Sequence, residues 1–214
     1  MTELSSIEDE GLRERKKRRT REAIVAAAME LFERRGFDAV TVAEIARAAD
    51  VSEKTVFNHF PAKEDLVFER GPERLAARAE ALRTRPAGTP IVAVFRRETD
   101  AYIDRLERSP VDEVTAGPRL VMGSASLRER LFLNWEKEAA LLAPIMAEQT
   151  GAPPGDLVPV VVARAVTWTH RVIVRAGFER LLAGEDRAVV AADLREQARR
   201  AYDLLDAGLA GYGA

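Results

Sequence analysis

The 214-residue sequence contains no cysteine and only two histidines. The lack of cysteine excludes disulfides, thiol nucleophiles and cysteine-based metal sites. No apolar run approaches the roughly 18 residues that a membrane-spanning helix needs, and the polar first ten residues lack the apolar core of a signal peptide. These absences predict a cytoplasmic protein with no membrane partner.

Motifs that place reactive groups at fixed spacing are also missing. The sequence has no phosphate-binding glycine loop, no nucleophile elbow and no HExxH zinc motif. His170 lies in an apolar stretch, where a hydrogen-bonded core histidine is commoner than a catalytic base. We therefore expect a protein that is not an enzyme and that has no cofactor and no metal.

Neither sign of charge dominates, since the formal net charge is −2, but the charges are unevenly placed. Residues 1–10 carry four acidic and no basic side chains, whereas residues 13–21 carry seven basic and one acidic. Residues 71–214 are neutral, with 20 side chains of each sign. A basic segment beside a neutral body is typical of a polyanion-binding region, although such runs are also common in solvated tails.

The hydrophobic pattern is helical almost throughout, and no stretch sustains the two-residue alternation of a strand. We therefore expect an all-α fold, with a first helix that ends at Gly36 and two short helices within residues 41–60. Proline and glycine clusters separate the later apolar segments. Gly71-Pro72 should kink or split the first of these. The later helices are predicted at residues 63–83, 90–108, 112–122, 125–149, 156–183 and 187–210.

Residues 41–60 are expected to form a helix, a tight turn and a second short helix. Thr41 and Glu44 have the spacing of a capping box, Ser52 is a suitable N-cap, and Pro61 ends the second helix after about two turns. Polar groups on its outer face could bind phosphates and base edges in a major groove, although any two-helix corner could look similar. The spacing places on that face Lys54, Thr55, Phe57 and Asn58, with His59 at its edge.

Residues 20–66 read TREAIVAAAMELFERRGFDAVTVAEIARAADVSEKTVFNHFPAKEDL. In order, they contain Thr-Arg, Leu-Phe, Gly-Phe, Thr-Val-x-x-Ile-Ala, Val-Ser-x-x-Thr and His-Phe. This stretch resembles the N-terminal domain of the TetR family of transcriptional regulators. The resemblance implies a three-helix helix-turn-helix DNA-binding domain at residues 20–66 and a larger helical ligand-binding and dimerisation domain at residues 67–214. Residues 1–19 would form a flexible arm, acidic and then basic.

The resemblance also assigns roles to single residues. Thr41, His59 and Lys63 would contact phosphates, and the recognition face would be lined by Ser52, Lys54, Thr55 and Asn58. Two positions depart from the family pattern. Phe57 replaces the usual tyrosine and so lacks a hydroxyl for phosphate, which leaves apolar contact only. Asp50 replaces the usual turn glycine, and it tolerates the left-handed conformation less well.

By the same resemblance, the protein would be a homodimer joined through its last two helices, about residues 156–210. It would bind a near-palindromic double-stranded DNA operator as a repressor, and a small-molecule effector would release it. Aromatic side chains on helical stripes offer candidate effector contacts, although such stripes are more often core. These are Phe95, Tyr102, Trp135 and Trp168.

Three alternatives stay open at this point. Glu98 and Glu138 lie on the same stripes, where a salt bridge to an arginine such as Arg171 or Arg175 is commoner than a ligand contact. Gly71-Pro72 is either a hinge or a loop between two helices. The whole chain could also be a helical interaction protein without specific DNA binding.

Overall fold

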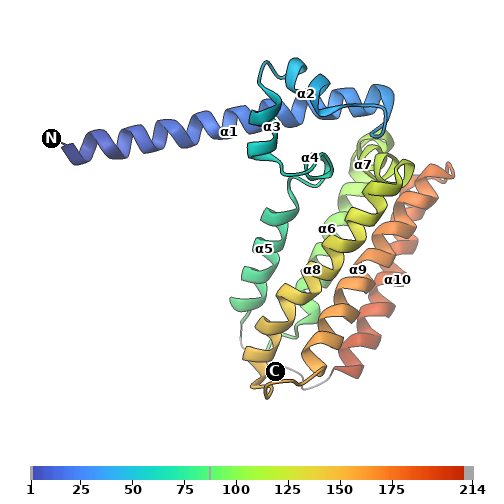
Figure 1. Ribbon diagram of the computed structural model, residues 1–214. Coiled ribbons are helices and arrows are strands. Elements are labelled where there is room, and N and C mark those ends of the chain that lie inside the picture. Colours follow the sequence, from blue (N-terminus) through green and yellow to red (C-terminus); the bar gives the residue numbers. More distant parts are fainter. Residues whose placement is uncertain (1, 87, 210–214) are drawn as a thin grey trace. The chain divides into compact units, whose positions relative to one another are not determined.

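The computed structural model describes residues 2–86 and 88–209, with side chains from residue 13 onward. Every regular element in this part of the chain is a helix, so the predicted all-α fold is confirmed (Figure 1). Each of these helices is too short or too polar to serve as a membrane span. Their bounds are α1 Thr2–Arg35, α2 Val42–Ala48, α3 Glu53–His59, α4 Glu64–Val67, α5 Gly71–Arg83, α6 Val92–Arg108, α7 Val111–Gly123, α8 Ala125–Thr150, α9 Val158–Leu182 and α10 Arg187–Gly208.

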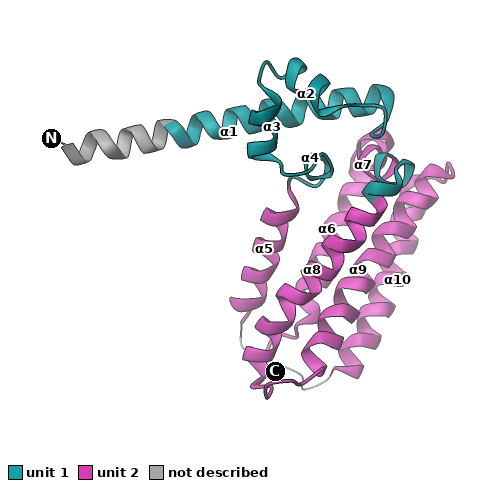
Figure 2. Cartoon of the chain, in the orientation of Figure 1, with its two compact units in different colours: residues 1–69, 120–127 teal, residues 70–119, 128–214 magenta. Residues whose placement is uncertain are grey.

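The chain divides into two compact units (Figure 2). Unit 1 comprises Met1–Glu69 and Leu120–Leu127, and unit 2 comprises Arg70–Arg119 and Arg128–Ala214. The corner between α7 and α8 therefore belongs to unit 1, which the sequence did not indicate. Ser124 at this corner is buried, and its hydroxyl donates to Asp38 Oδ1 at 2.8 Å.

Unit 1 is built on α1, which packs against α2 and α4 while α2 packs against α3. Gly36 ends α1 with a φ of 79°, a left-handed conformation that favours glycine, and its N–H donates to Phe32 O at 2.8 Å. The next residue, Phe37, folds back on Phe32 with 5.0 Å between ring centroids. The buried core of this unit includes Ile24, Phe32, Phe37, Ile45, Val56, Phe60 and Leu66.

Unit 2 is a helical bundle in which α6, α9 and α10 all pack against one another. Gly177 of α9 is required by close packing, because a Cβ there would lie 2.6 Å from the Tyr102 hydroxyl. That hydroxyl donates to Val174 O at 2.9 Å and so joins α6 to α9. The largest fully buried side chains of the unit include Phe95, Ile103, Leu106 and Tyr202.

The predicted helix at residues 63–83 is divided into α4 and α5. Gly71-Pro72 opens α5, with the proline in the first helical turn. A proline is accommodated there because its missing N–H would have had no partner within the helix. The dipeptide thus joins two separate helices in the structure, and a hinge motion at this point stays a prediction.

Candidate nucleic-acid interface

The start of α2 is held by the predicted capping box, which is confirmed. Thr41 Oγ1 accepts a hydrogen bond from Glu44 N at 3.3 Å, and Thr41 N donates to Glu44 Oε2 at 2.9 Å. Arg35 pairs with Glu44 at 2.7 Å. The Arg35 guanidinium, followed by the Thr41 donors, lowers the pKa of Glu44 to about 2. The Thr41 hydroxyl also donates to Glu44, so in this structure both of its donors are directed to that carboxylate.

The turn between α2 and α3 is compatible with aspartate. Asp50 has a φ of 53°, in the left-handed region where the family resemblance implies glycine. Asp is one of the few other residues that visit this region. Ser52 caps α3, because its Oγ accepts from Thr55 N at 3.1 Å. The short helix therefore begins at a fixed point with its first turn capped.

The side chains of α3 separate into an inner and an outer face, as the spacing predicts. Val56 and the adjoining Phe60 are buried, whereas Phe57 is 48% exposed. Lys54 and Asn58 are exposed, as are Ser52 and Thr41. Thr55 and His59 are half-buried at the edge of this surface. The outer face, residues 52, 54, 55, 57 and 58, thus combines an amine, hydroxyls, an amide and one exposed ring.

Two cations hold α3 and the following loop to neighbouring parts of unit 1: Arg21 belongs to α1, and Lys63 bonds to the loop between α1 and α2. Arg21 donates to His59 O at 3.1 Å and to Glu69 O at 3.4 Å, and its guanidinium lies 4.1 Å from the centroid of the Phe60 ring. Lys63 Nζ donates to Phe37 O at 3.0 Å and to the carbonyl of residue 40 at 2.9 Å. Arg21 was not among the predicted site residues, although it is the arginine of the Thr-Arg pair in the quoted stretch.

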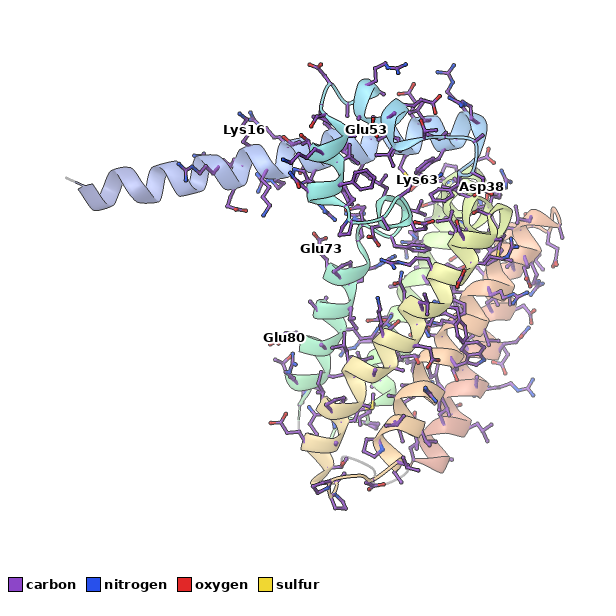
Figure 3. The ribbon with its side chains drawn as sticks, in the orientation of Figure 1. Lys16, Asp38, Glu53, Lys63, Glu73 and Glu80 are labelled. Carbon is purple, nitrogen blue, oxygen red and sulfur yellow. The ribbon has the colours of Figure 1, made fainter. Side chains whose placement is uncertain are left out.

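Lys63 was predicted to contact phosphate, and two of its three ammonium protons bind backbone carbonyls in this structure. The contact between Lys63 and phosphate stays a prediction. While both carbonyl bonds are kept, only the third ammonium proton can make this contact. Lys63 lies among the helices of unit 1 in Figure 3. His59 has a lowered pKa, first because of partial burial and then because of the nearby charges of Arg21 and Lys17. His59 is therefore neutral near pH 7 and offers one N–H donor.

The basic segment of the predicted arm is part of α1. Residues 13–19 continue the helix and are all exposed, and Lys16 is labelled on α1 in Figure 3. The charge of Lys17 contributes to the lowered pKa of His59, so this lysine of the basic segment lies near the end of α3. The side chains of the acidic residues 1–10 fall outside the described part of the chain. Mobility of residues 1–19 stays a prediction.

The four aromatic residues predicted to contact an effector differ in burial and in their contacts within unit 2. Phe95 is fully buried in the core. Tyr102 bonds to α9, and burial raises the pKa of its hydroxyl to about 12. Trp135 and Trp168 do meet, edge to face, with ring centroids 5.5 Å apart. Glu138, which shares a stripe with Trp135, pairs with Arg171, so the predicted salt bridge is confirmed. Effector contacts by the four aromatics stay predictions.

The chain thus combines a capped helix-turn-helix, whose outer face is polar, with a separate helical bundle. This combination defines a DNA-binding protein with a second domain for control. Two family models match in the corresponding places. The model described as bacterial regulatory proteins of the tetR family matches residues 24–69, and the MftR C-terminal domain matches residues 89–210. Since the second match alone covers more than half of the 214 residues, the chain belongs to the TetR family of bacterial regulatory proteins.

Individual proteins are similar to this chain in sequence or in fold. The transcriptional regulator TcmR of Streptomyces glaucescens is 32% identical over 151 residues, which cover 68% of this chain and 67% of TcmR. The regulator MftR of Mycobacterium tuberculosis H37Rv is 24% identical over 198 residues, 91% of this chain and 93% of MftR. The structure of NalD, a repressor from Pseudomonas aeruginosa, superposes with a TM-score of 0.53 at 22% identity and covers 87% of this chain and 96% of NalD. The predicted function, a ligand-responsive DNA-binding regulator, is confirmed at the level of the family.

Proposed function

We propose that this protein represses transcription as a homodimer bound to a near-palindromic operator, from which a small molecule in unit 2 releases it. The observation that carries this proposal is the outer face of α3. Its polar groups are exposed while Val56 and Phe60 fix the helix to the core. Such a helix can enter a major groove without rearranging its own domain. Because its partner is DNA, we place the protein in the cytoplasm, and we propose a regulator rather than an enzyme.

The side chains of the outer face suit different parts of DNA. Asn58 can bond the N6 and N7 edge of adenine, whereas Lys54 can bind guanine or phosphate. Phe57 has no polar group and would contact a thymine methyl group or sugar. Thr41, His59 and Lys63 would bind phosphates around the groove. For Thr41 this requires its hydroxyl to turn away from Glu44.

The proposed dimer uses the last two helices, about residues 156–210. Helix α9 carries exposed apolar side chains at helical spacing, namely Val161, Trp168 and Val172, and Leu204 is exposed on α10. A contiguous apolar stripe of this kind is typical of a protein–protein interface. In the dimer the two α3 helices would read half-sites about 34 Å, one turn of DNA, or a multiple apart.

Fluorescence anisotropy with DNA from upstream of the protein's own gene tests the function. We expect two protomers per operator and a footprint with two related half-sites. Val161→Glu should abolish the dimer by burying a charge in the interface, and should reduce operator affinity with it. Equal affinity for this DNA and for random DNA across a salt series would contradict specific regulation at that site.

A further inference from the structure

Four charged side chains from four helices meet inside unit 2. Arg78 of α5 donates from Nε to Glu98 Oε2 of α6 at 2.7 Å and also pairs with Glu138 of α8. Arg171 of α9 donates to Glu138 as well, so this carboxylate lies between two guanidinium groups. The side chains of Arg78, Glu138 and Arg171 are only 13%, 14% and 11% exposed. We refer to these four residues as the arginine cluster.

Stability alone does not explain why charged residues occupy these positions. Desolvation of a buried ion network offsets the attraction between its charges, and apolar residues of similar volume often serve as well or better. Apolar side chains on the same helices, Phe95 of α6 and Leu142 of α8, are fully buried nearby in sequence. A binding role explains the arginine cluster better than a purely structural one.

Positive charge from the arginine cluster acts on a neighbouring histidine. His170 is next to Arg171 in the chain, and its pKa is lowered to about 3. Burial is the largest cause, and the positive charges of Arg78, Arg171 and Arg74 follow. These three arginines all act on His170, and the carboxylates that oppose them are Glu98, Glu138 and, at Arg171, Glu136. Because Arg78 and Arg171 already hold one carboxylate between them, a carboxylate of a ligand can take the same place.

The neighbouring side chains indicate the shape of such an anion. A guanidinium group presents a planar fork of donors that matches a carboxylate, and here two forks face one carboxylate position. The Trp135 ring centroid lies 4.7 Å from the Arg171 guanidinium, and the Phe95 centroid lies 5.2 Å from that of Arg78. Trp168 packs on Trp135 and is 50% exposed in the single chain, so the ring pair extends from the proposed dimer face to the cluster.

We propose that the effector is an organic acid with an apolar, ring-containing body, whose carboxylate binds Arg78 and Arg171 in place of Glu138. This inference rests on the proposed ligand-responsive function and names the ligand class. Glu138 occupies the two arginines until the acid arrives. Its displacement breaks the link between α8 and α5, and α5 begins two residues after the end of the first segment of unit 1.

Tryptophan fluorescence reports on this part of unit 2, because the chain has only two tryptophans, Trp135 beside Arg171 and Trp168 packed on Trp135. The full chain is titrated with phenylacetate, 4-phenylbutyrate and 6-phenylhexanoate, and with the matching amides as neutral isosteres. Calorimetry provides a second readout. We expect saturable binding of at least one acid and about tenfold weaker binding of its amide, which lacks the charge. Equal binding of acid and amide, or no saturable binding of any acid, would overturn the proposal.

Substitutions locate the acid. Arg171→Gln should weaken acid binding about tenfold or more, since a charged fork is lost. Glu138→Gln should strengthen it several-fold, because the internal competitor loses its charge; weaker or unchanged binding by this variant contradicts displacement. If Arg171→Gln lowers the melting temperature too far for titration, Arg171→Lys keeps the charge without the fork and is expected to weaken binding in the same direction.

The matched control is Arg164→Gln. Arg164 also joins α9 to α8, through Glu136 at 2.6 Å, but these side chains are 61% and 45% exposed. Arg164 lines a separate groove of about 360 Å³ between the same two helices. Acid binding should be unchanged in this variant. A loss as large as that of Arg171→Gln would place the acid in the groove and overturn the proposal.

Operator binding without acid separates this inference from the proposed function. Wild type should bind the operator without acid, and Glu138→Gln should bind it more weakly, because this change loosens the same α5–α8 link that the acid is proposed to break. If wild type binds its operator but no acid, the inference on the ligand class fails alone. If wild type shows no DNA preference, the repressor function fails whatever the acids do.

Discussion

The outer face of α3 and the arginine cluster of unit 2 use polar side chains in opposite ways. On α3, Lys54 and Asn58 project to solvent from a helix whose other face is buried. In unit 2, the side chains of Arg78 and Arg171 are largely buried, only 13% and 11% exposed, and are already paired with carboxylates of the protein. A surface that binds DNA can remain exposed to solvent in the free protein. A buried cationic site needs a carboxylate of the protein as a partner, and a ligand must replace that partner. Substitutions should therefore act on binding alone at the first region, and on stability and binding together at the second.

The largest difference in stability between two substitutions is expected within α3 and its C-cap residue, Phe60. Phe60 is 2% exposed and lies under Arg21, whereas Phe57 is 48% exposed. Phe60→Ala should destabilise unit 1 by about 3–5 kcal/mol, the usual range for a buried phenylalanine, and Phe57→Ala by no more than about 0.5 kcal/mol. Hydrogen exchange of the unit 1 amides measures both. Similar losses for the two variants would mean that the outer face is part of the core.

Asn58 tests whether the open face reads sequence. Asn58→Ala should weaken binding to the best operator by about 1–3 kcal/mol and change non-specific binding little, because an adenine edge offers a bidentate contact to an amide. Lys54→Ala is the comparison, and it should weaken all sequences if Lys54 binds phosphate. Anisotropy on the operator and on random DNA separates the two. Equal loss on both DNAs in Asn58→Ala would remove this residue from base recognition.

Local sequence signals predicted the DNA-binding unit well. Gly36, the Thr41–Glu44 capping box and the Ser52 cap each depend on residues within a few positions of one another, so their physics is visible in a short stretch. The predicted helix at residues 90–108 likewise agrees closely with α6, Val92–Arg108, because proline, serine and glycine mark its ends.

Long-range contacts were predicted only in part. The pairing of Glu138 with an arginine followed from a carboxylate on an apolar stripe, but Arg78 was missed because its partners lie on α6 and α8, 20 and 60 residues away in the sequence. The contact between Ser124 and Asp38 also spans 86 residues, and neither residue stands out by type or periodicity. Helical spacing shows which face of a helix is buried, but not which other helix covers it.

A smaller effect is expected at the histidine of the buried region. The pKa of His170 is about 3 in the fold, against an ordinary value of 6.5, so the unfolded chain takes up a proton that the fold excludes as pH falls from 6.5. Unit 2 should therefore lose up to about 1.4 kcal/mol of stability per pH unit from this residue below pH 6. His170→Gln should flatten this dependence. Urea unfolding followed by tryptophan fluorescence at pH 7 and pH 5 measures the difference.

The control for this pH effect is His59→Gln in unit 1. His59 is only partly buried, and its pKa is lowered first by that burial and then by the charges of Arg21 and Lys17. Its replacement should leave the acid sensitivity of the tryptophan signal unchanged, since both tryptophans are in unit 2. An unchanged pH dependence in His170→Gln would show that carboxylates alone cause the acid sensitivity.

The smallest effect on stability and DNA binding is expected for Lys63. Like the outer face of α3 it is predicted to bind DNA, and like the arginine cluster it is already bonded within the protein, to two backbone carbonyls. Lys63→Met keeps the apolar stem and removes the charge. Loss of the carbonyl contacts should cost unit 1 about 1 kcal/mol. Loss of one phosphate contact should flatten the salt dependence of DNA binding by about one unit on every sequence. A lower stability with an unchanged salt slope would place Lys63 with Arg21, among the cations that hold the parts of unit 1 together, and outside the set that contacts DNA.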